Sequence, residues 1–259
     1  MINKKYQKHS VFLRLQKYAE FYNHLSSIII GFVKPGTGFF INHDTDLLSS
    51  MEGTIKSIHN ILFDGQINDA YALLRKYSDL ILINIYISIS LKESNNPEIF
   101  KKEEIKNWLH GKTKLPKFET MQKKLSSYPK LKEINKLLIE DTRYKEIRAR
   151  CNDHVHYNSY DHTIQNTNRI LIDSLKILDI FEQDLEDLFV MHVSYLFYLN
   201  DHYMMSSDYE DHLDCEMNPP EGSQYFVAPF VQDIFDEEIK KKRNAVAVLI
   251  KKNTSMLLE

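Results

Sequence analysis

The chain has 259 residues, enough for one large domain or two small ones with a sizeable core. Its 7 glycines and 7 prolines are too few for a many-turned β protein, and 43% apolar residues with runs of Leu, Ile, Lys and Glu favour a helical fold. The net charge of −3 by itself identifies no class of partner.

The first half of the chain shows helical spacing of its apolar residues. This spacing predicts a long helix over residues 5–33, a second over 44–63 and, after a tight turn at 64–65, a third over 67–93. The β-branched stretch 80–90 could also form a strand. We favour a buried central helix, because this stretch continues a helical pattern that starts before it.

The second half is predicted to be helical as well, with one exception. Residues 201–223 are acidic and rich in turn formers, which indicates an excursion from the core, and the next residues, 223–231, read as an extended segment. The remaining predicted helices cover residues 98–109, 117–127, 130–139, 142–157, about 166–200 and 231–254. With no internal repeat and no long linker, we expect a single all-α domain over residues 1–259. It would be a multi-helix bundle with an N-terminal helix and a C-terminal extended segment plus helix.

Several features bear on where the protein works. Two cysteines, Cys151 and Cys215, make no disulfide framework, which suits a reducing compartment. The N-terminal residues 1–18 lack the apolar core of a signal peptide, and the longest apolar run, 80–91, is too short to span a membrane. The sequence therefore predicts a soluble, cytoplasmic protein without a membrane partner.

Charge is distributed unevenly. Residues 101–150 hold 15 Lys and Arg against 7 Asp and Glu, whereas residues 151–239 hold 2 against 19. Such an asymmetry could steer an anionic ligand or pair two protomers, and it could equally reflect two solvated faces of opposite charge.

The stretch RYKEIRARCNDHVHYN, residues 143–158, concentrates polar side chains with acid–base or anion-binding chemistry. On a helix, the pairs Arg148–Asn152, Arg150–His154 and Asn152–His156 each share a face, because their members lie four residues apart. By the same geometry Arg150 and His156 lie about 240° apart, so they can meet only if the helix frays or a second chain takes part.

These residue types suit cleavage of RNA by its own ribose 2′-hydroxyl. An imidazole can take or give a proton near neutral pH, a guanidinium can stabilise charge on the phosphate oxygens, and an asparagine can orient either group. This chemistry requires no metal and no cofactor.

The stretch resembles the signature of the HEPN superfamily, whose nucleases carry an Arg, four to six residues and then a His. Both Arg150–His156 and Arg148–His154 have five residues between them, and residues 67–82 resemble the preceding helix of such proteins. The resemblance implies a HEPN-like core over about 44–200, followed by the acidic excursion and the C-terminal helix in 201–259.

The same resemblance implies a function. It predicts a metal-independent endoribonuclease that acts on single-stranded or loop RNA as a homodimer, in phage defence or as part of a toxin–antitoxin pair with a partner protein. In this interpretation His156 is the general acid or base, Arg150 stabilises the phosphate and Asn152 orients the reacting groups. His154 and Arg148 are further candidates.

One position departs from the family pattern and keeps an alternative open. If Asn152 is matched to the polar residue that usually follows the family's Arg, then Cys151 occupies the Arg position. The chain would then be a non-catalytic HEPN-like module for dimerisation or for binding a partner protein. A nucleotide-binding or nucleotidyl-modified antitoxin-type partner is a third, weaker option.

Other polar residues have competing interpretations. Arg75 is expected to pair with Asp79, and it could instead reach the motif as a phosphate contact. Cys151 is expected to be a small core residue, although a neighbouring arginine could also lower the pKa of its thiol. Two groups have metal-binding residue types. One is the set His192, Asp201, His202, Asp208, Asp211 and His212, whose spacing matches no familiar ligand pattern, which favours placement in a surface loop. The other is His154, Asp161 and His162, which could also be metal ligands.

Overall fold

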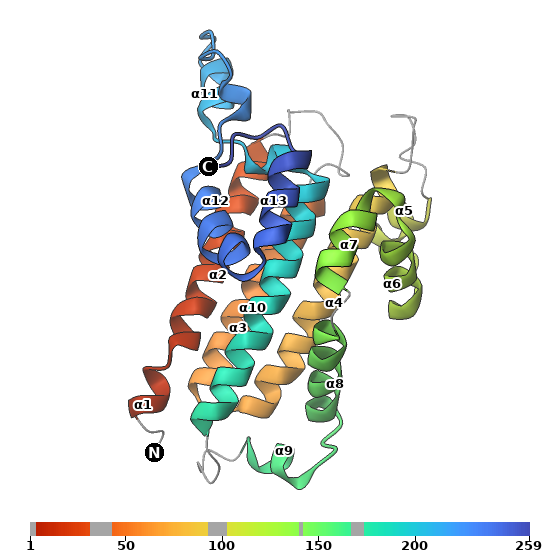
Figure 1. Cartoon of the computed structure of the whole chain (residues 1–259). Coiled ribbons are helices and arrows are strands. Elements are labelled where there is room, and N and C mark those ends of the chain that lie inside the picture. The colour runs from red at the N-terminus through yellow and green to blue at the C-terminus, as the bar shows by residue number, and fades with distance from the viewer. Residues whose placement is uncertain (1–3, 32–42, 93–102, 140–141, 167–173) are drawn as a thin grey trace. The chain divides into compact units, whose positions relative to one another are not determined.

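The computed structural model describes residues 4–31, 43–92, 103–139, 142–166 and 174–259. Within these ranges every regular element is a helix, and extended backbone pairs only at an isolated antiparallel bridge between Met205 and Val227 (Figure 1). The prediction of an all-α fold is confirmed. None of the described helices combines the length and the apolar character that crossing a lipid bilayer requires.

Four long helices dominate the structure, and short helices connect them. The α-helices are α1 (Lys4–Gln7), α2 (Ser10–Gly31), α3 (His43–Phe63), α4 (Ile67–Lys92), α5 (Glu103–Leu109), α6 (Phe118–Ser127), α7 (Lys132–Ile139), α8 (Arg143–Val155), α9 (Tyr160–Ile164), α10 (Ser174–Leu199), α11 (Asp208–Asp214), α12 (Pro229–Ile234) and α13 (Asn244–Asn253). The bounds of α3, α4 and α6 agree closely with the prediction, and residues 80–90 are helical.

The predicted N-terminal helix is divided into α1 and α2. The ring nitrogen Nδ1 of His9 accepts a hydrogen bond from the backbone N–H of Val11 at 3.2 Å, and this satisfies an amide at the start of α2 that has no partner within the helix. The predicted breaks at 32–36 and 94–98 and the predicted start of the long helix at 166–173 lie wholly or mostly outside the described residues.

The C-terminal region differs from the prediction. The acidic excursion contains α11, and short 3₁₀ turns flank it at Asp201–Met204 and Ser223–Tyr225. The expected extended segment is already helical at Pro229, where α12 begins. The expected single helix over 231–254 is a succession of α12, a π-helix over Phe235–Lys240 and α13.

The chain forms two compact units, each built from separate stretches of sequence. Unit 1 comprises residues 1–23, 48–81 and 141–189, and unit 2 comprises 24–47, 82–140 and 190–259. The four long helices α2, α3, α4 and α10 therefore contribute residues to both units.

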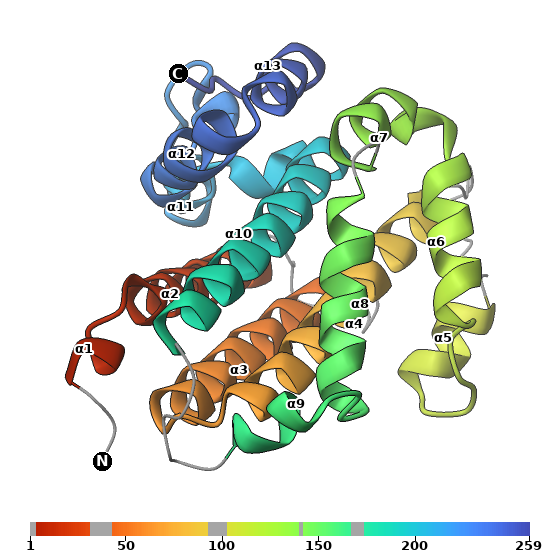
Figure 2. The same cartoon turned by 60° about the horizontal axis from the view of Figure 1, so that its bottom comes forward.

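Unit 1 is held together by buried aromatic residues. The rings of Tyr18 and Phe189 stack with centroids 3.6 Å apart, and the hydroxyls of Tyr22 and Tyr77 lie 2.7 Å apart. Helix α8 lies alongside the unit-1 part of α4 in both views (Figures 1 and 2). This packing gives α8 a rigid support on which polar side chains can be positioned.

Unit 2 contains a buried polar network around Asp44. Its carboxylate accepts hydrogen bonds from Asn84 Nδ2 at 2.7 Å and from the Tyr203 hydroxyl at 2.6 Å, and His43 Nε2 lies 3.2 Å away. Burial alone would raise the pKa of Asp44, but these donors outweigh burial and lower it. A buried carboxylate without such partners would be strongly destabilising.

Candidate functional site on helix α8

Helix α8 packs on unit 1 through one narrow face. Its buried residues are Ile147, Cys151 and His154, a spacing of four and three that lines one side of a helix. Burial raises the pKa of the Cys151 thiol to about 12, so the residue stays a thiol at neutral pH. The interpretation of Cys151 as a small core residue is confirmed. Every other side chain of α8 is at least partly accessible.

The C-terminus of α8 has a well-defined cap that fixes the direction of the following residues. The backbone N–H of Asn158 donates to the Asp153 carbonyl at 3.0 Å, and that of Tyr157 donates to the His154 carbonyl at 3.3 Å. This pair of bonds forms a Schellman motif, which places Tyr157 in the left-handed region with φ 51°. Glycine usually occupies that position, because a side chain there is strained.

Arg150 is bound to a buried carboxylate on α10. Its Nε and Nη2 atoms donate to the two oxygens of Asp184, each at 2.8 Å, in a bidentate pair. The Asp184 side chain is 5% exposed, whereas that of Arg150 is 39% exposed. Burial raises the pKa of Asp184, and the hydrogen bonds from Arg150 oppose that rise. The pair is electrically neutral, and it ties α8 to α10.

A second ionic cluster joins α8 to α4. Arg148 donates to Asp79 at 2.8 Å, and Arg75 forms an ion pair with the other oxygen of the same carboxylate. Arg75 Nε also donates to the side-chain carbonyl of Asn152 at 3.0 Å. Two guanidinium groups thus share the carboxylate of Asp79. The predicted pairing of Arg75 with Asp79 is confirmed, and the same arginine also contacts the motif.

His154 points into the core of unit 1. Its ring stacks on Tyr71 with centroids 4.0 Å apart, and its Nδ1 lies 2.9 Å from the side-chain oxygen of Asn68. The ring of His162 lies 4.3 Å away, centroid to centroid. Burial, with a smaller contribution from His162, lowers the pKa of His154 to about 4. His154 is therefore a neutral imidazole at neutral pH.

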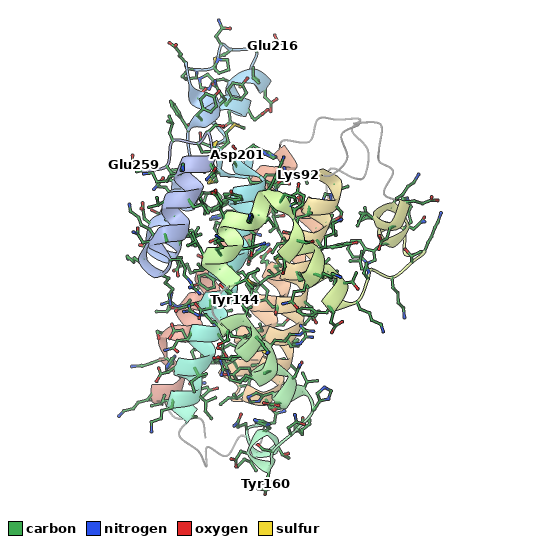
Figure 3. All side chains as sticks on the ribbon, turned by 45° about the vertical axis from the view of Figure 1, so that its right-hand side comes forward. Lys92, Tyr144, Tyr160, Asp201, Glu216 and Glu259 are labelled. Atoms are coloured by element: carbon green, nitrogen blue, oxygen red, sulfur yellow. The ribbon has the colours of Figure 1, made fainter. Side chains whose placement is uncertain are left out.

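His156 is the cap residue of α8 and is exposed. Its backbone N–H donates to the Asn152 carbonyl at 3.0 Å, so it follows Asn152 by one helical turn. Apolar or aromatic side chains surround it in the sequence: Val155 is 40% exposed, Tyr157 49% and Tyr160 78%. Figure 3 shows Tyr160 projecting outward from α9. Within the ranges that the structure describes, the His156 imidazole forms no hydrogen bond.

The structure separates the predicted site residues into four groups. Arg148 and Asn152 contact residues of α4, and Arg150 pairs with Asp184 on α10. His154 is buried in the core of unit 1, and His156 is exposed. Sequence reasoning missed Asp184 and Asn68. Their contacts with α8 span 34 and 86 residues, and no local spacing pattern reveals pairs so far apart.

The described residues contain no group of three or more His, Cys, Asp or Glu side chains arranged to hold a metal ion. Comparison of the chain with protein-family models, curated proteins and solved structures found no match.

Proposed function

We propose that this chain is a metal-independent endoribonuclease with a HEPN-like fold. The observation that carries the proposal is the cluster of Arg75, Arg148 and Asn152 around Asp79, with exposed His156 one turn beyond it on the same helix. Guanidinium groups and an accessible imidazole carried on one helix are the kinds of side chain that phosphodiester cleavage needs.

The roles follow from the contacts. His156 removes the proton of the ribose 2′-hydroxyl, whose oxygen attacks the phosphorus, and the 5′-oxygen leaves with a proton from a second acid. Arg148 and Arg75 stabilise the charge that builds on the phosphate oxygens. We assign this role to them rather than to Arg150, because the charge of Arg150 is already balanced by Asp184. The role of Arg150 is then to hold α8 against α10 through its pair with Asp184.

The second acid is the other copy of His156 in a homodimer. Support for a dimer comes from the exposed Val155, Tyr157 and Tyr160, which flank His156 and would bring two α8 ends together when covered. The strained backbone at Tyr157 adds to this support, because such strain often persists where the side chain serves a function.

The RNA would be single-stranded or in a loop, since its 2′-hydroxyl must reach the in-line position. A role in phage defence or in a toxin–antitoxin pair is part of the proposal.

The test is incubation of the purified chain with labelled single-stranded RNA in EDTA. We expect products with 2′,3′-cyclic phosphate ends, and we expect His156→Ala to slow cleavage by at least about 100-fold, the usual share of a general acid or base. His110→Ala, another exposed histidine, is the matched control and should cleave at the wild-type rate. Tyr160→Glu should shift the dimer toward monomer in sedimentation and reduce cleavage. Equal cleavage by wild type and His156→Ala, or none by either, contradicts the proposal.

The alternative is a non-catalytic HEPN-like module that binds a second copy or a partner protein. Two observations favour it specifically: Arg150 is tied to Asp184, and His154 is buried and neutral. Under this alternative Tyr160→Glu still disrupts the dimer, while no preparation cleaves RNA.

A further inference from the structure

A pocket of about 480 Å³ opens in unit 2, where the ends of several helices meet. Lys92 is the last residue of α4, Lys130 lies in the 3₁₀ turn Pro129–Leu131 and Tyr198 is near the end of α10. Known small-molecule sites have volumes of roughly 300–1,000 Å³, so this pocket is large enough for a compact ligand. It includes none of the residues that we propose for RNA cleavage.

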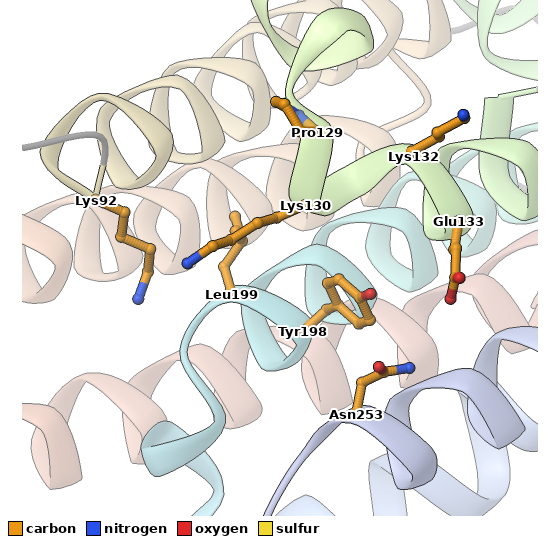
Figure 4. A pocket seen from close by; sticks show the side chains of 8 residues that line it. All are labelled: Lys92, Pro129, Lys130, Lys132, Glu133, Tyr198, Leu199 and Asn253. Atoms are coloured by element: carbon orange, nitrogen blue, oxygen red, sulfur yellow. The ribbon is translucent and has the colours of Figure 1, made fainter.

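Two ammonium groups converge in this pocket. Figure 4 shows Lys92 and Lys130 extending toward the same space. Burial lowers the pKa of Lys92, and the charge of Lys130 lowers it further, whereas the carboxylates of Asp201 and Asp44 only partly offset this. Among the residues that the structure describes, neither lysine has a carboxylate within ion-pair distance. Converging like charges without a paired anion favour the binding of an anion between them.

The rest of the lining suggests what the anion is attached to. The Tyr198 side chain is partly exposed and lies in the middle of the view in Figure 4. An accessible aromatic ring offers a face on which a planar group can stack. The amide of Asn253, the carboxylate of Glu133 and a third lysine, Lys132, also line the pocket. Lysine binds phosphate as a point charge, and two lysines match a doubly charged phosphate group.

We propose that unit 2 binds a small phosphate monoester with a planar ring, with its phosphate between Lys92 and Lys130 and its ring against Tyr198. The pocket takes a free small molecule rather than a segment of polynucleotide. A terminal monoester carries up to two negative charges, whereas each internal phosphate of RNA carries one, so the two lysines favour the former.

Adenosine 5′-monophosphate is a suitable probe, and isothermal titration calorimetry on the full chain measures its binding. We expect a dissociation constant of about 1 mM or tighter, typical of a small, polar and open site. Inorganic phosphate should bind more weakly, and adenosine should show no binding. Binding should weaken as salt is raised, because the attraction is largely ionic.

Two lysine variants make a matched comparison. Lys130→Gln removes one of the converging charges and should weaken binding of the monophosphate at least about tenfold. Lys136→Gln removes the same charge from an exposed side chain of α7 that is not among the residues lining the pocket, and it should change affinity less than about twofold. Tyr198→Leu should weaken binding of the monophosphate and leave that of inorganic phosphate unchanged.

Three outcomes would overturn the proposal. They are the absence of binding at millimolar monophosphate, equal effects of the two lysine variants when both are folded by circular dichroism, and equal displacement of the probe by a 2′-O-methyl oligoribonucleotide, which has no 2′-hydroxyl to attack the phosphate and lacks terminal phosphates. The last result would make the pocket part of a polynucleotide surface. Because none of these readouts involves RNA cleavage, failure of the ribonuclease proposal leaves this test unaffected.

Discussion

The pair of Arg150 and Asp184 joins a partly exposed guanidinium to a buried carboxylate. Removing Arg150 and removing Asp184 should therefore have different effects, because the group that remains is buried in the first case and partly exposed in the second. Without Arg150, the Asp184 carboxylate stays buried and has lost both hydrogen bonds of the pair. Without Asp184, Arg150 can turn toward water. The residue that sequence reasoning placed at the phosphate is, in the structure, one half of a structural contact.

This asymmetry gives a stability prediction. Arg150→Met should lower the free energy of unfolding by about 3 kcal/mol, the lower end of the cost of breaking a buried pair. Asp184→Asn should cost about 1 kcal/mol, because the amide can still accept a hydrogen bond from Arg150. Urea unfolding followed by circular dichroism measures both values.

The double variant Arg150→Met with Asp184→Leu serves as the control. It removes both charges, so it should be more stable than Arg150→Met alone. Equal losses for the two single variants would show that Asp184 is not buried as described.

At the scale of one helix, the way in which α8 ends has no clear signal in its sequence. The Schellman cap needs a left-handed residue, and Tyr157 occupies that position with φ 51°. Helix α11 ends in the same way: the backbone N–H of Met217 donates to the His212 carbonyl at 2.8 Å, and Glu216 has φ 55°. These two residues form a natural comparison, because only one of them lies next to the proposed site.

Replacing either residue by glycine tests whether the strain at α8 serves a function. Tyr157→Gly and Glu216→Gly should each raise the free energy of unfolding by up to about 1 kcal/mol, since glycine adopts this backbone without strain. Tyr157→Gly should at the same time weaken dimerisation and RNA cleavage, whereas Glu216→Gly should leave both unchanged. Thermal unfolding, sedimentation and the cleavage assay give the three readouts. Equal activity of the two variants would mean that the Tyr157 side chain has no role at the site.

Helix boundaries were predictable where a local signal marks them. The Asp64–Gly65 turn between α3 and α4 was visible in the sequence, and Gly65 has φ 82°. The pairing of Arg75 with Asp79 follows from a spacing of four residues on one helix. Both depend on residues close together in the sequence, which is why local sequence patterns were sufficient to find them.

Other features depend on contacts that sequence does not encode locally. The sequence of residues 223–231 read as an extended segment, yet Pro229 is well suited to the first position of a helix and begins α12 there. The partner of Arg150 and the burial of His154 are set by tertiary packing across 34 and 86 residues. The composition of α8 therefore indicated which residues could act, but it did not indicate which of them face inward.

On the scale of the whole molecule, each unit encloses a neutral histidine. His154 lies in unit 1, where burial first and His162 second lower its pKa to about 4. His192 lies in unit 2, where burial lowers its pKa to about 3 and its Nε2 lies 3.0 Å from the Asn84 side-chain oxygen. While the chain is folded, His154 and His192 bind a proton only at a pH well below the pKa of about 6.5 that a histidine has in an unfolded chain.

The folded chain should therefore lose stability on acidification. A histidine with a depressed folded-state pKa binds fewer protons when folded. Its contribution is complete above the unfolded pKa of about 6.5, and it declines below that pH by up to about 1.4 kcal/mol per pH unit per histidine. Urea unfolding between pH 7.5 and 5.5 separates the effect of buried histidines from that of the carboxyls, because unfolded carboxyls titrate near pH 4. Burial also lowers the pKa of His202, which contributes in the same direction. His154→Phe keeps a ring against Tyr71 but has no proton to bind, so its stability should depend less on pH. If His154→Phe and wild type showed the same slope, His154 would have to take up its proton without leaving the folded core.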